Sequence, residues 1–254
     1  MNPLAPRLPS RATKPRSTGL TMVIDGGIPL QLFDDIVAST PEYIDFVKFG
    51  WGTAIVTGGI RHKIDVLREH GIGFYFGGTL FEKYVAQERF DDYKRFCLEH
   101  GASHVEVSNG TILMSNAEKA SYIRKLADDF TVVSEVGFKD PDRSEQLPPS
   151  KWVEYINEDL AAGATMVTLE ARESGKSGIC RPDGALRFGL IEDVLSAGVT
   201  QDSLLFEAPT TTLQTYFVTR IGPDVNLGNV PASGVISLET LRLGLRADTL
   251  TAFE

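Results

Sequence analysis

The 254-residue sequence contains little cysteine and little histidine, with two Cys and four His. Cys97 and Cys180 have neither the spacing of a zinc site nor the density of a disulfide framework, which favours a reducing, cytoplasmic location. The histidines are not spaced as metal ligands either. No G-x-S-x-G motif occurs and neither cysteine has a recognisable general-base partner, so nucleophilic hydrolase chemistry is disfavoured.

The sequence also lacks a surplus of basic residues and any long apolar run. Its formal net charge is −9 and no long run of Lys and Arg occurs, which argues against a nucleic-acid partner. No stretch approaches the roughly 20 apolar residues of a membrane span, so we expect no membrane partner. A small anionic substrate fits the composition, because local basic groups can attract it against the overall charge.

Domain organisation follows from another absence. Residues 1–18 are rich in Pro and Arg without periodicity, which predicts a flexible N-terminal arm. Length alone allows one large domain or two smaller ones. No Pro- or Ser-rich linker divides residues 19–254, so we predict a single domain there.

Short β-rich runs alternate with segments of helical period, which predicts βα units and a parallel sheet. The runs cover residues 20–25, 43–50, 73–79, 103–110, 131–137, 165–171, 203–209 and 224–230. Between two of them, Ser115 and Glu118 have the spacing of a helix capping box. Eight such units in this length predict an α/β fold of the (β/α)8 TIM-barrel type. A doubly wound open sheet is the alternative, because periodicity does not separate the two.

Charged and amide side chains occupy the ends of the predicted strands, where a barrel builds its active site. They are Asp25, Lys48, Glu106, Glu135, Glu170, Glu207, Asn226 and Asn229. A carboxylate near a barrel core is costly unless it is paired or binds a metal. An all-oxygen set favours Mg²⁺ or Mn²⁺ over zinc, and the predicted metal ligands are Asp25, Glu106, Glu170 and Glu207. The alternative is that the acids form ion pairs with Lys48, Lys139 and Arg172 and do no chemistry.

Two basic segments complement these acids. Lys48 ends the second run, where it is a candidate anion binder, a base of lowered pKa, or an ion-pair partner. The segment TLEARESGKSG, residues 168–178, carries Arg172, Ser174 and Lys176 among glycines that let backbone N–H groups approach an anion. This segment is interpreted either as a substrate-binding wall or as a solvated loop, and it does not match a Walker loop.

Nine blocks in order resemble the phosphosulfolactate synthase (ComA-type) family. They are GLTMVID, YIDFVKFGWGT, GGTLFE, VEVSNGT, SEVGFKDP, DLAAGATMVTLEARESGKSGI, LLFEAP, VNLGNV and ISLETLRLGLRADT, spanning about residues 16–250. The resemblance implies a (β/α)8 barrel that adds sulfite to phosphoenolpyruvate with Mg²⁺ and yields 2-phospho-3-sulfolactate. It also implies a homo-oligomer with small anionic substrates.

The resemblance further implies roles for individual residues. Lys139 matches the second lysine of a Gly-Lys-Lys motif after the fifth strand, and is the expected general acid, with Glu135 and Lys48 as further catalytic residues. The expected substrate-binding residues are Arg172, Lys176, Ser174, Gln214, Asn226 and Asn229. Sulfite would attack C3, Mg²⁺ would stabilise the developing enediolate, and the acid would protonate C2.

Three strand tips depart from the family pattern. Gly26 stands in place of a lysine, Phe138 replaces the first lysine of the fifth-strand motif, and Thr211 and Leu213 occupy polar or basic positions. These changes remove groups that would hold an anion. They leave two alternatives open: a diverged enzyme with another nucleophile or acceptor, for example in secondary metabolism, and a non-catalytic, stress-related homologue.

Overall fold

The computed structural model describes residues 6–253, and eight parallel strands form its centre. They are β1 (Thr21–Asp25), β2 (Phe46–Phe49), β3 (Gly73–Phe76), β4 (His104–Val107), β5 (Thr131–Val136), β6 (Ala164–Leu169), β7 (Leu204–Glu207) and β8 (Leu227–Pro231). The hydrogen-bonded order is β3-β2-β1-β8-β7-β6-β5-β4, and the sheet curls until β3 lies beside β4. An open doubly wound sheet does not pair its first strand with its last. That alternative is therefore wrong, and the predicted (β/α)8 barrel is confirmed.

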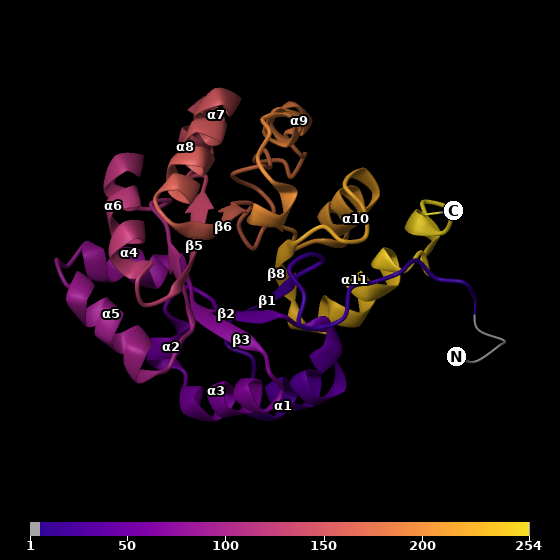
Figure 1. Ribbon diagram of the computed structural model, residues 1–254, viewed down its shortest axis with the longest axis horizontal. Coiled ribbons are helices and arrows are strands. Elements are labelled where there is room, and N and C mark those ends of the chain that lie inside the picture. The colour runs from indigo at the N-terminus through magenta and orange to yellow at the C-terminus, as the bar shows by residue number, and fades with distance from the viewer. Residues whose placement is uncertain (1–5, 254) are drawn as a thin grey trace.

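Helices form a ring around these strands (Figure 1). They are α1 (Leu30–Ser39), α2 (Thr53–Val56), α3 (Ile60–Glu69), α4 (Gly78–Val85), α5 (Phe90–Glu99), α6 (Asn116–Leu126), α7 (Pro141–Gln146), α8 (Pro149–Ala161), α9 (Phe188–Ser196), α10 (Thr211–Arg220) and α11 (Val235–Arg242). Short 3-10 helices cover Pro41–Tyr43, Gln201–Ser203, Ala232–Gly234 and Ala247–Thr249. The predicted cap is present, since Ser115 Oγ accepts a hydrogen bond from the Glu118 N–H at 3.2 Å. Within residues 6–253, none of these helices combines the length and apolar character that a bilayer crossing requires.

Apolar side chains fill the amino-terminal half of the barrel lumen. Strand alternation turns every second residue inward, and the buried inward-facing apolar residues form one cluster. Its members are Leu20, Met22, Tyr75, Val133, Met166 and Leu205. The outward-facing residues of the same strands pack against the helices in two larger clusters. Because apolar side chains close the amino-terminal half of the lumen, only its carboxyl end is left to hold a polar site.

The barrel is nearly closed, with a seam between β3 and β4. These two strands stand at the ends of the hydrogen-bonded order, although they are neighbours in space. Side chains bridge the gap: the Gly78 N–H, at the start of α4, donates to the Glu106 carboxylate on β4. The Tyr93 hydroxyl of α5 reaches the Glu106 carbonyl oxygen at 3.4 Å. We refer to this junction as the β3–β4 seam.

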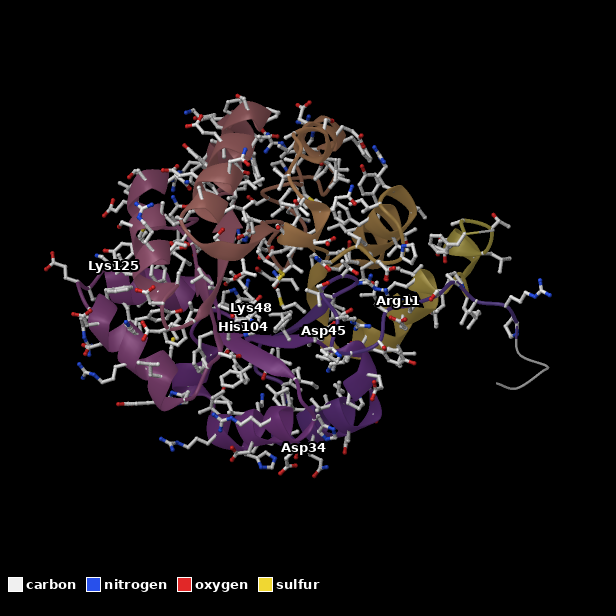
Figure 2. All side chains as sticks on the ribbon, in the orientation of Figure 1. Arg11, Asp34, Asp45, Lys48, His104 and Lys125 are labelled. Atoms are coloured by element: carbon white, nitrogen blue, oxygen red, sulfur yellow. The ribbon has the colours of Figure 1, made fainter. Side chains whose placement is uncertain are left out.

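The segment that precedes β1 lies along the amino-terminal end of the barrel. Arg16 forms a buried ion pair with Asp45 at 2.8 Å, and Lys14 Nζ donates to the Ile44 carbonyl at 2.6 Å. Arg11 reaches Glu239 of α11 at 3.0 Å, and Figure 2 shows it beside that helix. These contacts tie residues 11–16 of the predicted flexible arm to the barrel, while residues 1–5 of the arm lie outside the described residues.

Candidate active site

A cavity of about 260 Å³ opens at the carboxyl ends of the strands. Ionisable and polar residues dominate its wall, and Figure 2 shows one of them, Lys48, near the middle of the molecule. The lining residues are Ile24, Lys48, Trp51, Gly78, Thr79, Glu106, Thr111, Glu135, Lys139, Glu170, Arg172, Glu173, Glu207 and Asn229. This is the end at which a (β/α)8 barrel is expected to place its active site.

Lys48 is at the bottom of this cavity, at an inward-facing position of β2. Its Nζ lies 2.9 Å from Oε1 of Glu106 and 3.5 Å from one oxygen each of Glu135 and Glu207. Burial alone would lower the pKa of Lys48, but these three carboxylates raise it well above its usual value. The three carboxylates therefore favour the ammonium form of Lys48, in which it holds these acids together.

Lys139 stands on the cavity wall, three residues beyond the end of β5. Its Nζ contacts the Glu170 carboxylate and lies 2.8 Å from Oε1 of Glu135. Its backbone N–H donates to the Gly110 carbonyl at 3.1 Å, which fixes the start of its side chain. Burial opposes the charge, yet Glu135 and Glu170 raise the pKa of Lys139 well above its usual value. The side chain is thus a protonated lysine directed into the cavity.

Glu135, Glu170 and Glu207 form a compact acidic cluster. One oxygen from each lies within 4.8 Å of the other two, and all three residues are buried. Burial, followed by the charges of Glu135 and Glu207, raises the pKa of Glu170 well above its usual value. Mutual repulsion of this kind is relieved when carboxylates share a cation, and an all-oxygen donor set suits a hard divalent ion. The cluster could hold a metal ion. It combines two predicted metal ligands with Glu135, which was predicted as catalytic.

Glu106 faces the same space from β4 but stands outside that cluster. One of its oxygens is paired with Lys48 and the other accepts the Gly78 N–H across the β3–β4 seam. Burial, only partly offset by Lys48, raises the pKa of Glu106 to about 7. Its carboxylate therefore links the wall of the cavity to the closure of the barrel.

Arg172 lies within the segment 168–178 that the sequence singled out. Its backbone has φ of 59°, in the left-handed region, and its N–H donates to Oε1 of Glu170 at 2.5 Å. Its side chain lines the cavity, and the Nε atom is buried without a hydrogen-bond partner among the described residues. A guanidinium with an unused N–H beside a cavity is suited to bind a carboxylate or phosphate.

Asn229 enters the cavity because β8 bulges. Thr21 pairs with Leu227 whereas Val23 pairs with Val230, so one extra residue of β8 is accommodated between them. Asn229 takes up this irregularity with φ of 51°. It is 4% exposed, and its Oδ1 has no partner among the described residues. A strained, buried amide with a free polar atom indicates a ligand contact.

Asp25 is not among the residues that line the cavity. Its carboxylate faces α3, where Lys63 Nζ lies 2.5 Å away, and it also accepts the N–H groups of Gly27 and Ile28 at 2.8 and 2.7 Å. Both members of the Lys63 pair are buried. The structure therefore gives Asp25 a full set of partners away from the acidic cluster.

Four predicted substrate-binding residues also lie away from the cavity wall. Asn226 precedes β8 and ties the amino-terminal ends of the strands, accepting the Leu20 N–H at 3.0 Å. Gln214 is buried in α10 and donates to the Ala208 carbonyl at 3.0 Å. Ser174 and Lys176 are exposed on the loop after β6.

The prediction from the sequence missed three neutral residues of the cavity wall. Trp51, Thr79 and Thr111 follow β2, β3 and β4 and line the cavity. The prediction weighed charge at strand ends, and these three carry none. Their positions two to four residues beyond a strand end are the signal that would have found them.

Residues 9–248 match the family model for (2R)-phospho-3-sulfolactate synthase (ComA). The chain is 51% identical over 249 residues to the phosphosulfolactate synthase of Bacillus subtilis, covering 98% of this chain and 99% of that protein. The chain belongs to the phosphosulfolactate synthase family. The Methanothermobacter thermautotrophicus phosphosulfolactate synthase is 41% identical over 249 residues, with 95% of each chain covered.

A solved structure shares the fold of this phosphosulfolactate synthase family member. A crystal structure of 3-hexulose-6-phosphate synthase superposes with a TM-score of 0.55 at 16% identity, covering 87% of this chain and 98% of that chain. At this identity the likeness concerns the fold alone.

The departures from the family pattern lie outside the cavity wall. A side chain at Gly26 would begin 3.2 Å from the Trp51 ring, so the tryptophan occupies that space. The Phe138 ring stacks under the Arg143 guanidinium at 4.1 Å, and Leu213, a residue of α10, is buried in the core. Thr211 is exposed at the start of α10. With near full-length family relatives at 41% and 51% identity, the diverged and non-catalytic alternatives are not favoured.

Proposed function

We propose that this chain is a Mg²⁺-dependent phosphosulfolactate synthase, a carbon–sulfur bond-forming lyase that adds sulfite to phosphoenolpyruvate. The observation that carries the proposal is the placement of the Lys139 ammonium against two members of a three-carboxylate cluster at the cavity. An acid and an all-oxygen cation site side by side are what this addition requires.

Glu135, Glu170 and Glu207 would hold the metal. Together with Glu106 they place four buried carboxylates around two lysines, an excess of two formal negative charges when all are ionised. That excess equals the charge of a divalent cation, and oxygen ligands favour Mg²⁺. When bound, Mg²⁺ supplies positive charge next to the substrate carboxylate as negative charge develops there.

The reaction has one nucleophilic and one proton-transfer step. The sulfur lone pair of sulfite forms a bond to C3, and the electrons of the C2–C3 double bond move toward C2 and the carboxylate. Lys139 then donates its proton to C2, which completes 2-phospho-3-sulfolactate. Sharing Glu135 and Glu170 with a cation weakens the attraction that raises the pKa of Lys139, so its proton becomes easier to transfer.

The remaining polar residues of the wall would orient the substrates. Arg172 Nε and the side-chain amide of Asn229 are buried and have unused hydrogen-bonding capacity among the described residues. Thr79 and Thr111, which also line the cavity, would add hydroxyl groups. Lys48 would hold Glu106, Glu135 and Glu207 at fixed separation while the metal and substrates exchange.

The test is a direct assay. Purified protein is mixed with phosphoenolpyruvate, sulfite and Mg²⁺; loss of enolpyruvate absorbance is followed, and the product is identified by ³¹P NMR. We expect turnover that stops when EDTA removes the metal and resumes when Mg²⁺ is restored. Absence of product at all pH values from mildly acidic to mildly basic would reject the proposal.

The proposal also includes a cytoplasmic location and a homo-oligomeric state. Both cysteines are free and buried, which suits a reducing, cytoplasmic environment. The family resemblance suggests a homo-oligomer, which light scattering coupled to gel filtration would measure. A single species at the mass of one chain, 27.8 kDa, would contradict it.

A further inference from the structure

Glu82 is a buried carboxylate outside the cavity wall that joins two βα units across the β3–β4 seam. It lies in α4, is 1% exposed, and accepts four hydrogen bonds from the loop that follows β4. Oε1 accepts the Ser108 hydroxyl at 2.5 Å and the Gly110 N–H at 3.1 Å. Oε2 accepts the N–H groups of Thr111 and Ile112 at 2.8 and 2.9 Å.

All four of these donors are neutral. A buried carboxylate without a cation among its hydrogen-bond partners is tolerated only when such donors replace its water shell. The arrangement is therefore demanding in geometry, since four groups of one short loop must point at two oxygens. Conversely, the carboxylate fixes the course of residues 108–112. This loop has no other anchor from a strand ladder on that side, because β4 does not pair with β3.

The same loop touches the catalytic apparatus at two points. Thr111 lines the cavity. The Gly110 carbonyl accepts the backbone N–H of Lys139 at 3.1 Å. A Cβ atom at Gly110 would lie 3.4 Å from Cγ of Lys139, so the lysine stem rests directly against this glycine.

We propose that Glu82 is a positioning residue, which clamps residues 108–112 across the seam and thereby sets Thr111 and the general acid Lys139. The role of Lys139 rests on the proposed function. The clamp itself is a matter of structure, and so the two can be tested separately.

The variant Glu82→Gln keeps the shape of the side chain but replaces one accepting oxygen with an NH₂ group. We expect the amide hydrogens of residues 110–112 and 139 to exchange faster in metal-free, substrate-free protein, as measured by hydrogen–deuterium exchange. We also expect kcat to fall by up to about a hundredfold, the cost of a small misplacement of a catalytic group. Mg²⁺ affinity should change little, because the acidic cluster comes from β5, β6 and β7.

Two further variants keep the test decisive. Ser108→Ala removes one donor and leaves the carboxylate in place, so it should show the same changes to a smaller degree even if Glu82→Gln does not fold. Asp45→Asn is the matched control: it alters another buried carboxylate, paired with Arg16 at 2.8 Å at the amino-terminal end of the barrel, away from the cavity. It should lower the melting temperature while leaving kcat and the exchange of residues 110–112 and 139 unchanged.

Unchanged exchange at these amides in both Glu82→Gln and Ser108→Ala would overturn the clamp. Faster exchange with kcat within about twofold of the wild type would overturn its positioning role. Absence of any turnover by the wild type with sulfite and phosphoenolpyruvate would instead reject the proposed function, and the exchange result would still decide the clamp.

Discussion

At the scale of single residues, the site depends on which of its four carboxylates each of its two lysines contacts. Lys48 contacts Glu106, Glu135 and Glu207, whereas Lys139 contacts Glu135 and Glu170. Both lysines have a raised pKa and are fully protonated at neutral pH. Lys48 is enclosed, but Lys139 retains 24% of its side-chain exposure and so is the one that can reach a substrate.

Replacing Lys139 tests the acid assignment. In Lys139→Met the stem keeps its packing but no proton is available, so kcat should fall by about a hundredfold to ten-thousandfold. Steady-state kinetics with phosphoenolpyruvate and sulfite measure the change. Lys151→Met, which alters an exposed lysine of α8, is the control and should match the wild type. A Lys139→Met enzyme with near-normal kcat would show that the proton comes from elsewhere.

The two strand-end acids Asp25 and Glu170 should respond differently to the loss of charge. Glu170→Gln removes a proposed metal ligand and should weaken Mg²⁺ binding by at least about tenfold. Asp25→Asn leaves Lys63 buried and unpaired, which should cost about 3–5 kcal/mol of stability and leave Mg²⁺ affinity unchanged. Isothermal titration calorimetry and urea unfolding give the two quantities. Weaker Mg²⁺ binding by Asp25→Asn would show that Asp25 contributes to the metal site.

At the scale of elements, the loop after β6 depends on glycine. Gly178 has φ of 64°, and a Cβ there would fall 1.7 Å from the Glu170 carbonyl oxygen. Gly178→Ala should therefore destabilise the protein by more than the roughly 1–2 kcal/mol of a left-handed residue, and displace Glu170. Gly189→Ala, in α9 with open space around it, should instead be neutral or stabilising by up to about 1 kcal/mol. Equal urea midpoints for the two variants would refute this account.

Strand and helix periodicity predicted the elements well but not what each strand end touches. All eight predicted runs overlap an observed strand, and their carboxyl ends do surround one cavity. Asp25 shares its register position with Phe49, one residue after the inward pair of Ile24 and Lys48, so it faces the helices. That alternation was readable from the sequence once a register was assumed.

Other contacts depend on ring closure and are not encoded locally. The β8 bulge that turns Asn229 inward arises from pairing with β1, far away in sequence. The bonds from Glu82 to residues 110–112 exist only because β3 and β4 end up as neighbours. Patterns of spacing report on one element at a time, and such contacts are set by the assembly of several.

At the scale of the whole molecule, a network of buried arginine contacts lies at the end of the barrel opposite the cavity. Arg16 and Asp45 form a buried pair at the amino-terminal end, and Asp45 also accepts the Thr21 N–H at 2.8 Å. Arg11 and the buried Arg242 lie at the same end, where Arg242 donates to carbonyl oxygens at 2.5 to 3.2 Å. The cavity residues contribute nothing to this network.

This separation predicts a variant that is weakened but active. Arg16→Met leaves the Asp45 carboxylate buried without its cationic partner. The free energy of unfolding should therefore fall by about 3–5 kcal/mol, while kcat at moderate temperature stays at the wild-type value. Arg68→Met, which breaks an exposed pair with Asp65, should cost no more than about 1 kcal/mol. Chemical denaturation and initial rates give both readouts. A loss of kcat in Arg16→Met would contradict the prediction, because it would show that the amino-terminal end of the barrel influences the cavity.

The β3–β4 seam has a consequence for how such an enzyme can change over time. Around the rest of the ring, backbone hydrogen bonds hold neighbouring strands about 4.7–4.9 Å apart, and a change in this spacing would break those bonds. At the seam, the spacing at the mouth is set by the side chains of Glu82, Glu106 and Ser108. The circumference of the mouth can therefore be adjusted by substitutions at a few positions while the strand order is kept.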